Sequence, residues 1–271
     1  MKPIGIFDSG YGGLTVLKEV SAVLPEYDYL YLGDNARSPY GNRSFETVYQ
    51  YTLESVKWLF EQNCSLVILA CNTASAKALR TIQQKDLPNI APSKRVLGVI
   101  RPTAEVIGNY SPNKCIGIMG TSGTVNSGSY LIEINKFSPD AQLYQQACPM
   151  WVPLIENNEH NKPGATYFIK KYINELLTQC NKIDTILLAC THYPLLMDKL
   201  QEFVPVDIKV ITQGQIVANA LKIYLENHPE IADNCSKGGQ ITLFTTDNPK
   251  DFDEHSGTFF GKSIPSNYIQ L

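Results

Sequence analysis

Several signatures are missing from this sequence, and each absence excludes a class of protein. The seven cysteines form no Cys-x-x-Cys pair, which argues against a zinc ribbon or a thioredoxin-type redox centre. No run of lysine and arginine stands out and the formal net charge is −3, so nucleic-acid binding has no electrostatic support. No apolar run approaches the roughly 18 residues of a membrane span. Pro3 and Asp8 interrupt any apolar stretch after Lys2, so the N-terminus does not resemble a signal peptide. We therefore expect a cytoplasmic protein with no nucleic-acid and no membrane partner.

The usual marks of a bound cofactor or metal are also absent from the sequence. The glycine-rich turn at residues 8–13 is neither G-x-G-x-x-G nor a P-loop, since no Gly-Lys-Ser/Thr follows it. No spacing of histidine, cysteine and carboxylate residues suits a metal, and no lysine motif indicates a Schiff base. We expect no cofactor and no metal.

The composition is that of an ordinary globular protein, with 44% hydrophobic and 18% charged residues in a chain of 271. Short, near-continuous apolar runs alternate with amphipathic stretches of helical length, which is typical of an α/β fold whose parallel sheets are covered on both faces. We predict strands at residues 2–7, 27–32, 66–70, 96–99, 115–119, 185–189, 208–211 and 241–245. We predict helices at residues 14–24, 44–62, 72–83, 167–178 and 214–225.

One pattern occurs twice along the chain. A strand that begins Ile4-Gly5-Ile6 is followed by a later one that ends Leu69-Ala70-Cys71. Ile116-Gly117-Ile118 and Leu188-Ala189-Cys190 stand in the same order at a similar separation. This repeat predicts two similar α/β units, each with its own mostly parallel sheet, related by a pseudo-twofold. The stretch from about residue 208 resembles neither repeat, so it forms either a third small unit or a return to the first.

Polar motifs follow four of the predicted strands directly. They are Asp8-Ser9-Gly10, Cys71-Asn72-Thr73, Thr121-Ser122-Gly123 and Cys190-Thr191-His192. Ligands of open parallel sheets bind beyond the carboxyl ends of the strands. We therefore expect the active site to lie in a cleft between the two units, where these motifs meet.

Cys71 and Cys190 differ from the other cysteines because polar residues follow them directly. Cys71 is expected at the N-terminus of the helix at 72–83, a position that favours a thiolate. Cys190 has His192 two residues on as a candidate proton partner. Equivalent positions in the two repeats predict thiols on opposite sides of one cleft. Such a pair can remove a proton from one face of a carbon atom and return one to the other face.

These candidates also have purely structural interpretations. Asp8 or Ser9 suits the N-cap of the helix at 14–24. His192 alone suits a structural role, and Glu156, after an apolar stretch punctuated by prolines, suits the surface. We expect buried apolar roles for five cysteines, Cys64, Cys115, Cys148, Cys180 and Cys235.

The polar loop at residues 32–41 allows two interpretations as well. Its Pro39-Tyr40-Gly41 segment is either a simple turn or a wall of the site. In the second case Tyr40 and Gly41 touch the ligand.

Taken together, these segments resemble the glutamate racemases of the aspartate/glutamate racemase family. The resemblance extends over most of the chain, and the two cysteine motifs in this context are specific. The matching segments are 7–10 with 12–16, 33–34 with 39–41, 70–76, 117–124, 147–149 with 152–154, 190–196 and 244–246.

The resemblance implies a cofactor-independent enzyme that interconverts L- and D-glutamate and supplies D-glutamate for peptidoglycan. Carried over residue by residue, Cys71 and Cys190 would be the acid/base pair. Asp8 would assist Cys71, His192 would assist Cys190, and Glu156 matches a carboxylate near the second cysteine. The implied substrate contacts are Asp8, Ser9, Tyr40, Gly41, Asn72, Thr73, Thr121, Thr191 and His192.

The resemblance also implies a domain organisation. Residues 1–98 with 210–271 would form the first α/β domain, and residues 99–209 the second. By analogy we expect a homodimer.

Three departures from the family pattern stand out. Tyr11 replaces a small aliphatic residue, and Thr103 stands where glycine is frequent. The segment Thr212-Gln213-Gly214-Gln215 replaces a sequence more like Asp-Ser-Gly-Glu. None of them removes a catalytic candidate, but we expect Tyr11 and residues 212–215 to affect cleft shape or domain packing.

Three other functions stay open at this point. A related enzyme with two cysteines, such as an aspartate racemase, a maleate isomerase or a hydantoin racemase, would differ mainly in pocket volume, which the sequence does not give. A non-catalytic module that binds a small dicarboxylic amino acid would keep the cleft, although opposed thiols serve little purpose in binding. A role as an inhibitor of a DNA enzyme is less favoured, since we expect no extra N-terminal segment.

Overall fold

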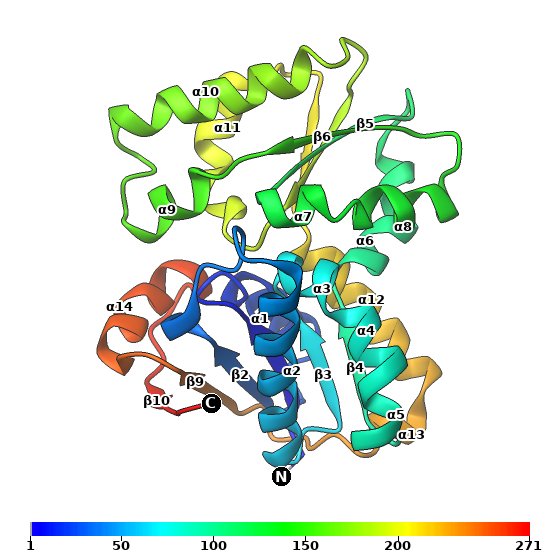
Figure 1. The fold of residues 1–271 in the computed structure, drawn as a ribbon, viewed down its shortest axis with the longest axis vertical. Coiled ribbons are helices and arrows are strands. Elements are labelled where there is room, and N and C mark those ends of the chain that lie inside the picture. The colour runs from blue at the N-terminus through cyan, green and yellow to red at the C-terminus, as the bar shows by residue number, and fades with distance from the viewer. Residues whose placement is uncertain (1) are drawn as a thin grey trace.

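The structure is a computed structural model that describes residues 2–271. Within this range the named strands form two sheets, one of six strands and one of four. Figure 1 shows each sheet with its helices as a separate half, the larger below and the smaller above. Every pairing between these strands is parallel, which confirms the predicted α/β class with two parallel sheets.

The larger sheet has the spatial order β10 (Ser266–Tyr268), β9 (Ile241–Thr245), β2 (Tyr29–Gly33), β1 (Ile4–Asp8), β3 (Leu66–Leu69) and β4 (Arg95–Gly98). The smaller sheet has the order β6 (Gln142–Ala147), β5 (Cys115–Gly120), β7 (Thr185–Ala189) and β8 (Lys209–Ile211). The four neighbours β2-β1-β3-β4 thus match β6-β5-β7-β8, and the sequence repeat is a repeat of topology.

Helices connect these strands on both faces. The α-helices are α1 (Leu14–Val23), α2 (Phe45–Glu61), α3 (Asn72–Lys77), α4 (Leu79–Thr81), α5 (Leu87–Ile90), α6 (Ile100–Ile107), α7 (Ser122–Asn126), α8 (Ser129–Phe137), α9 (Trp151–Glu156), α10 (Pro163–Leu177), α11 (Met197–Phe203), α12 (Gly214–Asn227), α13 (Pro229–Ala232) and α14 (Pro249–Phe260). Three segments are 3₁₀ helix, namely η1 (Asn35–Arg37), η3 (Gly108–Tyr110) and η4 (Tyr193–Leu196), and η2 (Ile82–Asp86) is a turn of π-helix. No helix within residues 2–271 is both long and apolar enough to cross a bilayer.

After β8, which belongs to the smaller sheet, the C-terminal stretch adds β9 and β10 to the larger sheet. β9 pairs with β2, with Tyr31 opposite Leu243, and α12 packs against α1. The domain division after residues 98 and 209 remains our proposal. It is supported by the sheet that most of each segment joins. β8 of the smaller sheet runs across the second boundary.

Burial explains which elements the sequence predicts well. All residues of β1, β2, β3, β5 and β7 are buried, so their apolar runs are continuous. The sequence of β6, Gln-Leu-Tyr-Gln-Gln-Ala, is polar and gives no strand signal. This is possible because β6 lies at a sheet edge and is only partly buried. The helix predicted at 72–83 is interrupted at Ala78, where φ is −112°, and continues through the wider turns of η2.

Strand-to-helix turns bring polar side chains to the boundary between the halves. Cys71 is the N-cap of α3, and its Sγ accepts a hydrogen bond from Ala74 N at 3.5 Å. Thr121 caps α7 in the same way through Thr124 N at 3.2 Å. α3 of the larger half packs against α7 of the smaller half. The carboxyl ends of the two sheets therefore face each other.

Candidate active site

A narrow cavity lies between the two halves. Its volume is about 40 Å³. Cys71 and Cys190, which follow β3 of one sheet and β7 of the other, both line it. The structure thus brings the two sequence-predicted thiols to one cavity from opposite halves.

Cys71 lies in a buried environment that disfavours negative charge. Its Sγ donates a hydrogen bond to Ser9 Oγ at 3.5 Å, and its side chain is almost fully buried. Burial, followed by the nearby charge of Asp8, raises the pKa of Cys71 to about 12. At neutral pH, Cys71 is therefore a thiol and a proton donor.

Cys190 has a basic partner instead. His192 Nδ1 lies 4.0 Å from Cys190 Sγ, and His192 Nε2 lies 2.9 Å from Glu156 Oε1. Burial by itself would lower the pKa of His192, but the contacts with Cys190 and Glu156 outweigh it and raise the pKa to about 10. At neutral pH the imidazole is a cation held between Cys190 and a carboxylate.

Asp8 lies one layer behind the cavity wall. Its Oδ1 accepts from Gly10 N at 3.0 Å, and its Oδ2 accepts from the Thr191 hydroxyl at 3.3 Å. Burial raises the pKa of Asp8, while the charge of His192 partly offsets this effect. Asp8 thus reaches both sides of the site, acting on Cys71 through charge and holding Thr191 by a hydrogen bond.

The remaining predicted contacts are held by bonds within and between the halves. The Tyr40 hydroxyl donates to Asp34, and Thr73 Oγ1 lies 2.9 Å from Thr121 Oγ1 across the boundary. Gly41 O accepts from Gly123 N at 2.7 Å. These bonds fix the walls from both sides.

The sequence-predicted set and the cavity lining agree closely. All of the predicted residues except Asp8 line the cavity, including Glu156, which the sequence also allowed at the surface. Whether each acts as predicted remains a proposal. Ser38 and Pro39, from the polar loop that the sequence allowed as a wall of the site, also line the cavity. Sequence reasoning missed the lining residues Asn42, Cys148, Pro149, Val152 and Pro153.

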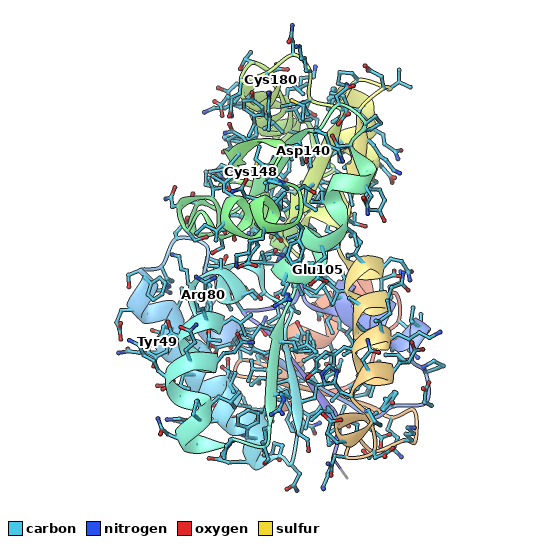
Figure 2. All side chains as sticks on the ribbon, turned by 90° about the vertical axis from the view of Figure 1, so that its right-hand side faces the viewer. Tyr49, Arg80, Glu105, Asp140, Cys148 and Cys180 are labelled. Atoms are coloured by element: carbon cyan, nitrogen blue, oxygen red, sulfur yellow. The ribbon has the colours of Figure 1, made fainter. Side chains whose placement is uncertain are left out.

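A signal for some of the missed residues was present in the sequence. Cys148, Pro149, Val152 and Pro153 lie in segments that match the family. Cys148 is buried, as expected, and it also lines the cavity. By contrast, Cys180 is labelled in Figure 2 at the end of the smaller half remote from the larger sheet, where its Sγ lies 3.3 Å from that of Cys115.

The family departures also have definite places. The ring of Tyr11 stacks on His255 of α14 at 4.5 Å between ring centroids. Thr103 and Gln213 contact each other, since Gln213 Nε2 donates to Thr103 Oγ1 at 2.8 Å. The last two departures therefore form one contact.

No group of three or more histidine, cysteine, aspartate or glutamate side chains suited to a metal occurs within residues 2–271.

The raised pKa of His192 predicts that the free energy of unfolding depends on pH. The pKa of His192 is raised from 6.5 to about 10, so the folded chain holds a proton that the unfolded chain releases between these pH values. We expect the free energy of unfolding to fall as pH rises through this window, by up to about 1.4 kcal/mol per pH unit. Urea denaturation between pH 7 and 8.5 measures the slope.

His192→Gln should flatten that slope, because the variant carries no titrating group at this position. Equal slopes for the two proteins would show that His192 does not hold the extra proton.

Comparisons with known proteins agree with this geometry. Residues 14–221 match the model of a family described as Asp/Glu/Hydantoin racemase. A glutamate racemase of Sulfurihydrogenibium sp. is 38% identical over 270 residues, which are 99% of this chain and 97% of that protein. A crystal structure of a glutamate racemase isoform from Bacillus anthracis has a TM-score of 0.90 at 31% identity and covers 100% of this chain and 98% of its own.

A second crystal structure, of glutamate racemase from Francisella tularensis in complex with D-glutamate, has a TM-score of 0.87 at 29% identity. The match covers 99% of this chain and 97% of that one. The family match spans well over half of the chain, and the relatives match over nearly their full length. The chain therefore belongs to the Asp/Glu/Hydantoin racemase family, and it is an amino-acid racemase.

Proposed function

We propose that this chain interconverts L- and D-glutamate by a two-base mechanism that uses two thiols and no cofactor. The observation that carries the proposal is the placement of Cys71 and Cys190, from opposite sheets, on one buried cavity. A substrate carbon between them would have one sulfur on each face.

The reaction moves one proton off the α-carbon and another onto it. For one enantiomer, one cysteine as thiolate removes the α-proton and becomes a thiol. The other cysteine, as thiol, gives its proton to the opposite face and becomes a thiolate. For the reverse direction the two roles exchange. Atoms and charge balance, and the thiols regain their first state by exchanging protons with their neighbours.

The main difficulty is the weak acidity of the α-carbon. Negative charge that develops on the substrate carboxylate in the transition state must be stabilised by donors aimed at it. The side chains of Asn72, Thr73 and Thr191 on the cavity wall are suited to this task. The cavity is narrow, and excluding water strengthens such interactions.

The two thiols have different charged neighbours. The His192 cation stabilises negative charge on Cys190, whereas the buried Asp8 favours the Cys71 thiol. Protonation of Asp8 would make the Cys71 thiolate easier to form. We therefore assign His192, with Glu156 behind it, to the Cys190 side and Asp8 to the Cys71 side.

The choice of glutamate rests on the relatives. The relatives from Sulfurihydrogenibium, Bacillus anthracis and Francisella, which match over nearly the full chain, are glutamate racemases, and the Francisella structure is a complex with D-glutamate. The family resemblance further suggests that the product serves peptidoglycan synthesis in the cytoplasm and that the enzyme is a homodimer; both are part of this proposal.

Circular dichroism of the amino acid tests the proposal directly. In buffer with a metal chelator and no added cofactor, L-glutamate and D-glutamate should both lose their ellipticity and reach the same racemic end point. We expect L-aspartate to react on the order of 100-fold more slowly, because a pocket matched to one chain length discriminates against a missing methylene.

Other outcomes would identify the alternatives. Faster turnover of L-aspartate would indicate an aspartate racemase. Thermal stabilisation by glutamate without any loss of ellipticity would indicate a binding module and refute the proposal.

A further inference from the structure

The side-chain amide of Asn72 is half-satisfied. Asn72 is 3% exposed and lines the cavity. Its Oδ1 accepts a hydrogen bond from the Tyr130 hydroxyl at 2.5 Å, whereas its Nδ2 has no partner within residues 2–271. Buried donors without partners are uncommon in folded proteins. The free Nδ2 is thus the end of the amide that is available to an acceptor in the cavity.

A chain of hydrogen bonds leads away from Asn72 into the protein. The Tyr130 oxygen, which donates to Asn72, accepts from Gln213 Nε2 at 2.6 Å. Gln213 Nε2 also donates to Thr103 Oγ1 at 2.8 Å, and the Thr103 hydroxyl donates to Val99 O at 2.9 Å. Tyr130 and Thr103 are fully buried, and Gln213 is 5% exposed.

These hydrogen bonds decide which atom donates and which accepts at each of the four side chains. The Thr103 hydroxyl gives its hydrogen to Val99 O, so its oxygen must accept from Gln213, and Gln213 must present its NH₂ end. The same NH₂ group donates to Tyr130, which leaves the phenol hydrogen for Asn72. An amide has two ends of nearly the same shape, and its partners decide its orientation.

We propose that Gln213 and Tyr130 are positioning residues that hold Asn72 with its Nδ2 hydrogens toward the α-carboxylate of the substrate. We call the series Thr103, Gln213, Tyr130 and Asn72 the relay. Its role rests on the proposed function, since the free Asn72 donor is assigned to the carboxylate on which charge develops. Neither Gln213 nor Tyr130 lines the cavity, so both act through Asn72.

The relay also joins both connections between the two halves. Val99 and Thr103 lie on the segment that leaves β4, and Gln213 lies on the segment that returns from β8. Tyr130 belongs to α8 of the smaller half, and Asn72 begins α3 of the larger half. The donor in the cavity is therefore set only when both connections and both halves are in place.

Gln213→Glu is the sharpest test, because it reverses the end of the relay. A carboxylate accepts from Tyr130, so the phenol oxygen is left to accept from Asn72, and Asn72 turns its Oδ1 toward the substrate carboxylate. We expect kcat for glutamate to fall on the order of 100-fold, the loss typical of a missing transition-state donor. KM should change far less, because the charge on the carboxylate grows in the transition state.

Tyr130→Phe removes the hydroxyl that connects Gln213 with Asn72, but it gives Asn72 no reason to turn round. We expect a loss in kcat of about 10-fold. The double variant Gln213→Glu with Tyr130→Phe should recover to about the level of Tyr130→Phe alone, because the hydroxyl that transmits the reversal is gone. Two losses that add would instead indicate that each residue serves packing alone.

Gln215→Glu is the matched control. It makes the same chemical change two residues on, at an exposed side chain that donates to Asn219 Oδ1, and its kinetics should equal those of the wild type. Unfolding midpoints are measured for every variant. If Gln213→Glu does not fold, Gln213→Met, which removes the donor without adding charge, replaces it with an expected loss of about 10-fold.

Two failures are distinguishable. Wild-type kcat in Gln213→Glu, or losses that add in the double variant, beside an active wild-type enzyme would overturn the relay alone. A wild-type protein that racemises neither glutamate nor aspartate would overturn the proposed function. In that case the calorimetric affinity for D-glutamate tests the relay. Gln213→Glu turns an amide oxygen toward the substrate carboxylate, so we expect it to bind D-glutamate several-fold more weakly than the wild type does, a smaller change than the one in kcat. Equal affinities would overturn the relay.

Discussion

Replacing either Cys71 or Cys190 with alanine is expected to abolish racemisation, with a loss of about 10³-fold or more. Each thiol supplies a proton transfer on one face of the carbon, and general acid–base groups contribute roughly 10²–10⁴-fold. The two losses should not add in the double variant, because neither thiol can complete the reaction without the other. Loss of ellipticity from L-glutamate and from D-glutamate measures the effect.

The matched control for these variants is Cys64→Ala. Cys64 is a fully buried cysteine in the larger half and does not line the cavity. Cys64→Ala should lose about as much stability as Cys71→Ala and Cys190→Ala, a small amount, while it keeps full activity. Full retained activity in Cys71→Ala or Cys190→Ala would refute the pairing of the two thiols.

Serine variants extend this test to the individual proton transfers. Cys71→Ser and Cys190→Ser each weaken one acid/base group and leave the other intact. In deuterated solvent, each variant should show unequal isotope effects in the two directions, since each thiol serves one enantiomer. Equal effects in both variants would indicate a single base that acts on both faces.

Gly12→Ala is expected to lower activity on the order of 100-fold, since a shift of about 1 Å in catalytic groups has effects of this size. A Cβ atom on Gly12 would lie 2.3 Å from Thr191 Oγ1 and 2.4 Å from His192 Nδ1. Both side chains are buried, so the methyl group must displace them. Overpacking of this kind also destabilises a fold by roughly 1–3 kcal/mol. Steady-state kinetics and urea denaturation measure the two effects.

Gly164→Ala provides the control for that substitution. Gly164 lies in the first turn of α10, and a Cβ atom there meets no heavy atom within 4 Å. We expect unchanged kinetics and a stability equal to or slightly above that of the wild type. Normal activity in Gly12→Ala would show that the turn tolerates displacement of His192.

Strands are predicted correctly where the local sequence is apolar because the strand is buried. The central strands of both sheets are covered on both faces, and a buried strand must be apolar along its whole length. The edge strand β6 escaped prediction because one neighbour and partial exposure permit a glutamine-rich sequence. The pairing of β9 with β2 joins residues about 210 positions apart, and no local pattern encodes such a partner.

The predicted site residues come together at one cavity for a related reason. Residues that follow parallel strands gather at one edge of each sheet, so the strand ends alone favour a position for Cys71 and Cys190 at the site. Glu156 was a weaker candidate, because only packing brings α9 close enough for its carboxylate to contact His192. Gln213 carried no sequence signal of function beyond its departure from the family pattern.

The sequence by itself determined the class of fold, the duplication and the two cysteines, because periodic burial and turn chemistry are written in neighbouring residues. Only the tertiary structure decided which side chains meet across the boundary: Thr73 with Thr121, and Asn72 with Tyr130 and Gln213. Such contacts depend on how two separately formed sheets pack, and that packing is set by the shape of the whole core rather than by any one segment.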